Sequence, residues 1–468
     1  MYLMLFAPAP ASSVFILIFR PIIHSKMKFI VPAMFAFVVL AFTSCTQNDN
    51  SKKYTNDPFL YSKTVKRLND VVLENNFAPM VGSRNYAYAN IAAYECVAAG
   101  DPTFNSLAGQ IKHFPVMPKP EAGKKIDFSL AALLAFTKVG NAVTFPEGSL
   151  MGYYEELKKG ADSAGLSKEV IDNTIAFSDA IVTAVIDWSK NDNYAKTRTA
   201  ARYTVLDSPG RWVPTPPMYA TGVEPHWREI RTLVLDSASE CMPVRPPQFN
   251  ITDKNSVFYK AMMEVKNTGD SLTDEQKHIA DFWDDNPFKL NVTGHVMYAT
   301  KKFSPPGHWM NIVGIACKKA GADFNTTVAA YTHTAITMFD AFISCWDEKY
   351  RSNLVRPETV INKYIDADWM PYIQTPPFPS YTSGHGTVSA AVAESMTAQF
   401  GDNFAFTDTS LLEFGIKNRT LTSFRHAAQE AAMSRLYGGI HYRFDNDNGA
   451  AAGKKVGELA VRRLKLKK

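Results

Sequence analysis

The chain has 468 residues, of which 46% are hydrophobic and 20% charged, and its formal net charge is +5. This composition is typical of a globular protein with ample material for a core, and it excludes an intrinsically disordered chain. The last fifteen residues hold seven basic side chains and one acidic side chain, so the rest of the chain carries a net charge of −1. A body without excess positive charge argues against nucleic-acid binding.

The N-terminus has the pattern of an export leader. From Met27 it reads MKFIVPAMFAFVVLAFTSC, with a basic Lys28, an apolar run over 29–42 and small residues before Cys45. The run has signal-peptide length and is too short to span a bilayer comfortably. The end of this segment resembles the lipobox of bacterial lipoproteins, although Phe42 stands where leucine is usual.

This pattern predicts that residues 1–45 are a leader, with Met27 as the true start and Cys45 as the lipidated residue. The protein is then expected to be exported, periplasmic or at the cell surface, and joined to a membrane only through its lipid anchor. The alternatives are an uncleaved signal anchor and a buried helix. The polar residues 46–56 are interpreted as a flexible tether.

Apolar spacing beyond the tether is helical, and strand-like alternation is scarce, which predicts an all-α fold. Ser167 is an expected N-cap, and Thr273 to Gln276 has the form of a capping box. We expect an N-terminal helical part over 57–202 and a helical bundle over 203–468, joined by an irregular connection rich in proline and glycine. None of the five cysteines forms a CxxC pair, and a disulfide among the last four stays open: Cys96, Cys241, Cys317 and Cys345.

Three C-terminal segments carry candidate site residues. In CWDEKYRSNLVRPETV, Lys349 and Arg356 are seven apart, which places them near one helical face, with Pro357 ending or kinking that helix. Such a pair is usually solvated.

The second segment, PPFPSYTSGHGT, changes from a proline-rich strip to a helix pattern at Ser383, Gly384 and His385. A helix N-terminus offers unpaired N–H groups and a favourable dipole to an anion, although many such sequences serve only as caps.

In the third segment, SRLYGGIHYRFDND, Arg435 lies near a predicted helix end at Tyr437, before a Gly-Gly turn. Asp445 follows His441 by four residues and could hold its ring in one tautomer. His426, on the helix of Arg435, is interpreted as packing or surface. His308, in PPGHW, has no evident partner and is interpreted as structural.

The order K-x6-R-P, S-G-H and S-R-x5-H resembles the signature of the type 2 phosphatidic acid phosphatase and vanadium-dependent haloperoxidase superfamily. The resemblance covers roughly the last 190 residues and is closest in spacing to bacterial vanadium iodoperoxidases. Thr382 departs from the proline common before Ser-Gly-His. The resemblance implies a helical bundle that holds one vanadate per chain between its C-terminal helices, with Trp346 and Phe378 beside the cofactor.

The resemblance also implies roles. Lys349, Arg356 and Arg435 would hold the oxyanion with charge-assisted hydrogen bonds, together with Ser383 and the N–H of Gly384. In a haloperoxidase, His441 coordinates vanadium, His385 moves protons and Lys349 polarises bound peroxide. The partners are hydrogen peroxide, a halide with iodide favoured, and small organic or inorganic acceptors.

Two alternatives share these residues. An exported acid phosphatase would use His441 as the nucleophile of a phosphohistidine intermediate, Asp445 to orient it and His385 to protonate the leaving oxygen. A surface lipoprotein could bind oxyanions without chemistry. The aromatic neighbours Trp346 and Phe378, and the long N-terminal part, favour the peroxidase.

Overall fold

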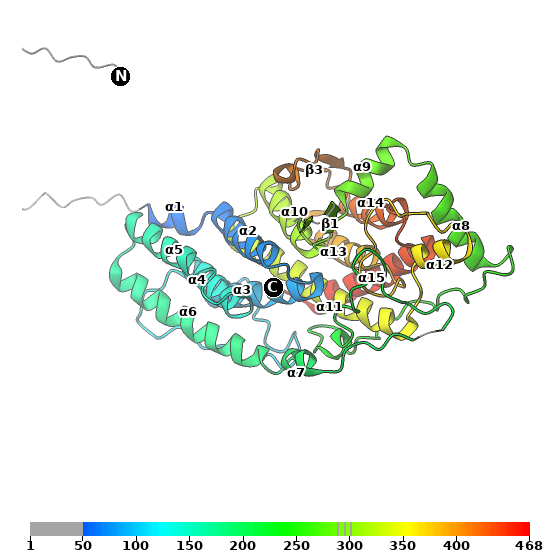
Figure 1. Ribbon diagram of the computed structural model, residues 1–468. Helices are drawn as coiled ribbons and strands as arrows, with labels where there is room; N and C mark the ends of the chain where they lie inside the picture. Colours follow the sequence, from blue (N-terminus) through cyan, green and yellow to red (C-terminus); the bar gives the residue numbers. More distant parts are fainter. Residues whose placement is uncertain (1–49, 207, 288–289, 294–295, 300–301) are drawn as a thin grey trace, which may run out of the picture. The chain divides into compact units, whose positions relative to one another are not determined.

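The computed structural model describes residues 50–206, 208–287, 290–293, 296–299 and 302–468. These residues form fifteen α-helices, two short 3-10 helices and two small two-stranded sheets, so the predicted all-α fold is confirmed (Figure 1). The predicted leader and Cys45 lie outside the described residues. Among those described, no helix combines the length and apolarity that crossing a bilayer requires.

Seven helices precede the long irregular connection. Their bounds are α1 Ser51–Thr55, α2 Pro58–Glu74, α3 Pro79–Gly100, α4 Phe128–Ala142, α5 Met151–Ser163, α6 Lys168–Ser189 and α7 Tyr194–Thr199. The predicted cap at Ser167 is present, and its side chain accepts the N–H of Val170 at the start of α6. The prediction of a flexible tether over 46–56 is wrong for α1, because Ser51 and Thr55 are buried and Thr55 donates to Asp127.

The rest of the chain adds eight helices and the short elements. Their bounds are η1 Trp227–Glu229, α8 Val257–Asp270, α9 Asp274–Phe282, β1 Leu290–Thr293, β2 Val296–Ala299, α10 Pro305–Ala320, α11 Phe324–Ser352, α12 Pro357–Tyr364, α13 Gly384–Phe400, β3 Phe406–Asp408, η2 Leu412–Phe414, β4 Arg419–Leu421, α14 Phe424–Tyr437 and α15 Arg443–Arg463. Both sheets are antiparallel hairpins, β1 with β2 and β3 with β4. The predicted capping box of Thr273 and Gln276 begins α9.

Helix α11 is the central element of the fold. It is 29 residues long, nearly all of its residues are buried, and it packs against α3 on one side and α13 on another (Figure 1). Its Asp340 accepts the backbone N–H groups of Leu233, Val234 and Leu235 at 2.7–2.9 Å, which fixes the irregular connection on the helix. Since a helix buried all round needs neighbours on every face, both segments of the chain complete its packing.

One hydrophobic core extends from Tyr61 on α2 to Leu466 near the C-terminus. The C-terminal residues return to the N-terminal helices, where the hydroxyl of Tyr94 donates to the carbonyl of Leu466. Residues 50–468 belong to one compact unit, and the division at 202/203 stays a prediction. The four described cysteines are buried and free, so no disulfide joins them.

Helix α15 lies unusually close to α13, which carries His385 in its first turn. A Cβ atom added at Gly453 would lie 1.9 Å from the backbone oxygen of Thr387, and one at Gly449 would lie 3.1 Å from that of Ser383. Glycine is therefore required where the two helices touch. This contact brings the start of α13 next to the residues that precede α15.

We expect Gly453→Ala to destabilise the protein by about 1–3 kcal/mol, because the added methyl group forces the two helices apart. Gly152 on α5 is the matched control, since nothing lies within 4 Å of the Cβ position there. Gly152→Ala should be stabilising by about 0.4–1 kcal/mol. Chemical denaturation measures both, and equal effects of the two substitutions would contradict the close packing of α13 on α15.

Candidate functional site

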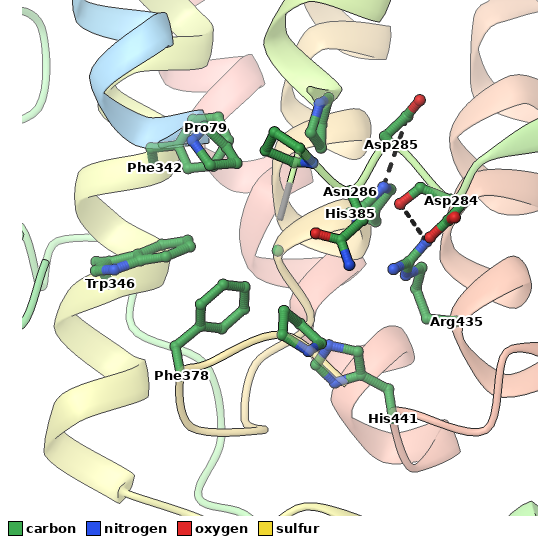
Figure 2. A pocket seen from close by; sticks show the side chains of 14 residues that line it. Pro79, Asp284, Asp285, Asn286, Phe342, Trp346, Phe378, His385, Arg435 and His441 are labelled. Carbon is green, nitrogen blue, oxygen red and sulfur yellow. Dashed lines mark hydrogen bonds and ion pairs between the residues drawn. The ribbon is translucent and has the colours of Figure 1, made fainter. Parts of the chain in front are cut away.

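The three predicted segments converge at one cavity (Figure 2). Of the predicted site residues, Trp346, Phe378, Gly384, His385, Arg435 and His441 line it. Residues not predicted complete the lining: Pro79, Asp284, Asp285, Asn286, Pro287, Pro305, Phe342 and Pro376. Lys349, Arg356 and Ser383 do not line the cavity but lie directly behind it, since Lys349 and Arg356 contact Phe378 and Ser383 precedes Gly384.

The route by which Arg356 reaches the site differs from the prediction. Helix α11 ends at Ser352, and Asn353 closes it in the left-handed conformation, so Lys349 and Arg356 do not share a helix. Pro357 begins α12 as its first residue, where its missing N–H costs nothing, and Arg356 is the preceding N-cap residue. The predicted single helical face is wrong, although both cations reach the same site.

His441 is held by Asp445. The Nδ1 atom of His441 lies 2.9 Å from Oδ2 of Asp445, and this oxygen also accepts from the Ser380 hydroxyl and the N–H of Tyr442. Because the backbone N–H of Tyr442 can only donate, Oδ2 is an acceptor, which places the ring proton on Nδ1 and the lone pair on Nε2. Burial, reinforced by the nearby Arg356 and Lys349, holds the pKa of His441 well below its usual value. The ring is therefore neutral and its Nε2 is available as a ligand or nucleophile.

Three buried cations surround this histidine: Lys349, Arg356 and Arg435, called here the cation cluster. The Lys349 ammonium donates to the carbonyls of Pro379 and Ser380, at 2.9 and 3.0 Å. Arg356 donates to the carbonyls of Phe378 and Ile440, and its Nη1 lies 3.0 Å from Nε2 of His441.

The hydrogen bonds of Arg435, like those of Lys349, go to backbone carbonyls. Arg435 donates to the backbone carbonyls of Trp283 and Asp284, while its Nε and the Nη2 of Arg356 are buried without a partner among the described residues. Burial lowers the pKa of Arg356 to about 9 and that of Arg435 to about 10, and it lowers the pKa of Lys349. Desolvated cations with spare donors favour an anion as the missing partner.

The N-terminus of α13 adds the partial positive charge of a helix dipole to the site. Ser383 is its N-cap, as predicted, and its Oγ accepts the N–H of Gly386 at 3.2 Å, which leaves the hydroxyl proton free to donate. His385 follows in the first turn, and burial with the nearby Arg435 lowers its pKa to about 4. Near neutral pH this imidazole is an uncharged base beside the cavity.

Two aromatic side chains line the side of the cavity opposite Arg435 (Figure 2). The rings of Trp346 and Phe378 lie 5.0 Å apart, and the Lys349 ammonium is 4.9 Å from the centre of the Phe378 ring. Trp346 Nε1 donates to the carbonyl of Val223, so the irregular connection fixes its orientation. The cavity thus joins an apolar surface to a positively charged one (Figure 2).

Comparison with known proteins places this site in a family. Residues 329–467 match the family described as the VCPO second helical-bundle domain. A bacterial vanadium-dependent iodoperoxidase of known structure is 42% identical, with a TM-score of 0.83 over 87% of this chain and 97% of the other. The chain belongs to the vanadium-dependent haloperoxidase family.

More distant haloperoxidases share the fold. The holo form of a bacterial vanadium-dependent chloroperoxidase is 17% identical, with a TM-score of 0.62 over 83% of this chain and 92% of the other. The apo form is likewise 17% identical, with a TM-score of 0.62 over 82% and 93% of the two chains. A search of curated proteins gives no significant match.

This haloperoxidase has an acidic side that the sequence did not reveal. Asp284 and Asp285 follow α9 and line the cavity, and Oδ2 of Asp285 lies 3.6 Å from Nε2 of His385. His308, interpreted from the sequence as having no partner, lies between Asp285 and Asp408. In the sequence, these acidic site residues could have been suspected only from the adjacent aspartates Asp284 and Asp285, which stand between a capped helix and a proline.

His426 is half-buried on α14, as predicted, and accepts from Thr422.

Inorganic phosphate should raise the melting temperature of the protein, because a tetrahedral oxyanion binds only the folded cation cluster. At one hundred times its Kd, phosphate stabilises by about 2.7 kcal/mol. Arg435→Gln should remove most of this rise. Arg425→Gln, on the same helix α14 but pairing with Glu394 and Asp402 at the surface, should retain it. Equal protection of the two variants by phosphate would contradict the assignment.

Proposed function

We propose that the protein is an exported, vanadate-dependent haloperoxidase that oxidises iodide with hydrogen peroxide. The reaction is H₂O₂ + I⁻ + H⁺ → HOI + H₂O, in which peroxide is reduced by two electrons and iodide is oxidised. The observation that carries the proposal is a neutral, carboxylate-held His441 within contact of buried cations that have spare hydrogen-bond donors. Family membership sets the class of chemistry.

The residues present fit a vanadate ion. His441 Nε2 would bind the metal, since it is unprotonated and directed at Arg356 rather than at a carboxylate. The cation cluster, with Ser383 and the N–H of Gly384, would hold the oxygens of one vanadate per chain. Vanadate, when bound, would activate peroxide towards attack by halide.

The protein's own side chains supply the proton transfers and the electrostatics. His385, neutral near pH 7, is placed to accept a proton from incoming peroxide, and the Asp285 carboxylate beside it stabilises the imidazolium that forms. Lys349 contributes positive charge that polarises peroxide once it is bound. The rings of Trp346 and Phe378 line the cavity and would give halide an apolar surface along which to approach.

Iodide is favoured because the iodoperoxidase relative is 42% identical over most of both chains, and because iodide is the easiest of these halides to oxidise. The product, hypoiodous acid, would react with small organic or inorganic acceptors. Phosphatase chemistry would use the same His441 and Asp445, so the effect of vanadate on turnover separates the two functions: a peroxidase requires vanadate and a phosphatase is inhibited by it.

The proposed location is the periplasm or the cell surface, with a lipid on Cys45 as the only membrane attachment. It is supported by the basic residue, apolar run and small residues that precede Cys45 in the sequence. Incorporation of labelled fatty acid in a bacterial host, lost in Cys45→Ala, tests this proposal.

Protein reconstituted with vanadate should oxidise iodide in the presence of peroxide, more efficiently than bromide or chloride. The apo protein should be inactive and should recover activity in proportion to bound vanadium. The measurement is triiodide formation for each halide, with and without vanadate. Phosphomonoester hydrolysis by the apo form, blocked by vanadate and without peroxidase activity in the loaded form, would overturn the proposed function.

His441→Ala should abolish vanadium retention, because the substitution removes the Nε2 atom that lies 3.0 Å from Arg356 of the cation cluster. Elemental analysis after dialysis measures the vanadium content per chain. His426→Ala is the control, since this half-buried histidine does not line the cavity and its ring accepts from Thr422 near the start of α14. Stoichiometric vanadium in the His441→Ala protein would exclude His441 as the ligand.

A further inference from the structure

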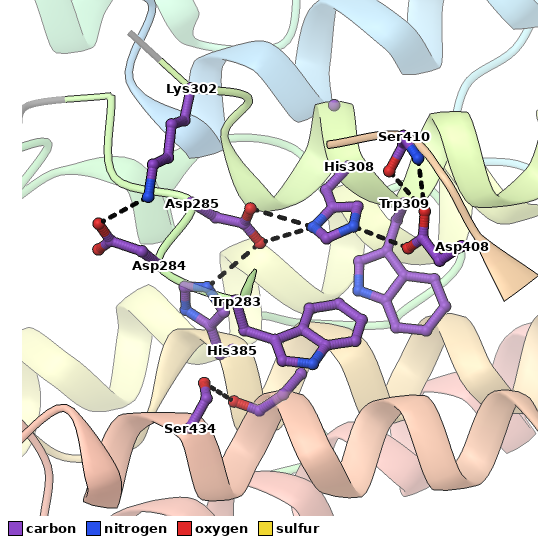
Figure 3. Close-up of polar contacts among 12 residues, drawn as sticks. Trp283, Asp284, Asp285, Lys302, His308, Trp309, His385, Asp408, Ser410 and Ser434 are labelled. Atoms are coloured by element: carbon purple, nitrogen blue, oxygen red, sulfur yellow. Dashed lines mark hydrogen bonds and ion pairs between the residues drawn. The ribbon is translucent and has the colours of Figure 1, made fainter. Parts of the chain in front are cut away.

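His308 forms a second buried histidine centre, whose polar contacts Figure 3 shows, and its partner Asp285 lines the cavity. It lies in the first turn of α10, fully buried, between Asp285 of the loop after α9 and Asp408 at the end of β3. Its Nδ1 is 3.0 Å from Oδ1 of Asp285, and its Nε2 is 2.9 Å from Oδ2 of Asp408. These three residues are called here the His308 clamp.

The clamp requires a proton on each nitrogen of His308. Ionised carboxylates only accept hydrogen bonds, and a neutral imidazole has one N–H, so two carboxylate partners are satisfied only by the doubly protonated ring. The other oxygen of Asp408 accepts from both the N–H and the hydroxyl of Ser410, which orients Oδ2 towards Nε2 of His308. Although burial opposes the charge, the two carboxylates raise the pKa of His308 to about 10.

The surroundings of the ring stabilise the same charged form. The Trp283 indole stacks on His308 with ring centres 4.8 Å apart, and Phe282 packs against its edge at 5.4 Å. An aromatic face next to an imidazolium is favourable. Among the described residues, the ionisable groups that contact the ring are Asp285 and Asp408 alone.

The clamp reaches the active site through Asp285. Oδ2 of this carboxylate contacts His308 at 3.1 Å and faces Nε2 of His385 at 3.6 Å, a separation that a small rotation converts into a hydrogen bond. On the side of the cavity, His385 is near Arg435 and His441. Asp284, the residue before Asp285, pairs with Lys302. An Asp285 carboxylate at this position favours the tautomer with the proton on Nε2, which leaves Nδ1 as the basic atom.

We propose that His308 is a positioning residue for His385: its doubly protonated ring, clamped by Asp408, holds the Asp285 carboxylate as the acceptor for the Nε2–H of His385. The role of His385 as proton acceptor rests on the proposed function, whereas the clamp itself does not. Through Asp285, His308 fixes both the tautomer of His385 and the charge beside it.

The clamp is tested first without turnover. The full-length protein is labelled with ¹⁵N-histidine, and long-range ¹H–¹⁵N spectra of the ligand-free form are recorded at pH 8. We expect the imidazole signals that disappear in His308→Gln to show both nitrogens protonated, and His385 to be the Nε2–H tautomer. The signals of His226, whose ring nitrogens contact Glu229 and the carbonyl of Ala201, are identified separately with His226→Gln. Spectra in which His308 is neutral at pH 8, or in which His385 carries its proton on Nδ1, would overturn the proposal.

The second test is the pH profile of kcat/KM for peroxide with iodide. In His308→Gln a positive charge is lost, so the Asp285–His385 pair binds a proton more tightly and the acidic limb should move up by about one pH unit. Asp408→Asn removes a negative charge and should move the limb down. His333→Gln, which removes another buried histidine bonded to Ser395, should leave it unchanged.

The outcomes separate the two proposals. A wild-type protein without vanadate-dependent peroxidase activity contradicts the proposed function, and the histidine spectra then still decide the clamp. If activity falls in His308→Gln but the acidic limb of the pH profile does not move, His308 is only a packing residue. The same conclusion follows if the acidic limb moves by the same amount in His333→Gln. If His308→Gln does not fold, the downward shift in Asp408→Asn carries the test, and an unchanged or upward shift there overturns the proposal.

Discussion

Burial of the cation cluster at one point is the constraint on which the site depends. Lys349, Arg356 and Arg435 are removed from water, and their hydrogen-bond partners are backbone carbonyls and the lone pair of His441. Desolvated charge of this kind is costly, and removing it would often stabilise a protein. An oxyanion bound among these cations would offset that cost, which makes affinity for a tetrahedral anion an expected property of this arrangement.

The helices give this cluster its geometry. The close contact of α15 with α13, made possible by Gly453, sets His441 opposite the N-terminus that carries His385. Helix α11 delivers Lys349 from a fully buried position, and the irregular connection fixes Trp346 through Val223. The N-terminal helices take part through Pro79, which lines the cavity, so the site is not confined to the matched family domain.

The sequence predicted what local chemistry determines. Features that depend on short-range patterns were predicted and are present. They are the helix caps at Ser167, Thr273 and Ser383, the end of α14 at Tyr437, and the pairing of His441 with Asp445. The path from Lys349 to Arg356 was predicted wrongly, because the left-handed Asn353 ends α11 early. The His308 clamp was missed because its members come from α10, the loop after α9 and β3, and no periodicity relates them.

The most direct test is a crystal structure of the protein loaded with vanadate, with anomalous difference density to locate the metal. The account predicts one peak per chain, bonded to Nε2 of His441, with the cation cluster turned from the backbone carbonyls towards its oxygens. A peak elsewhere, or vanadate in the cavity without a bond to His441 and with the cations still on their carbonyl partners, would contradict it.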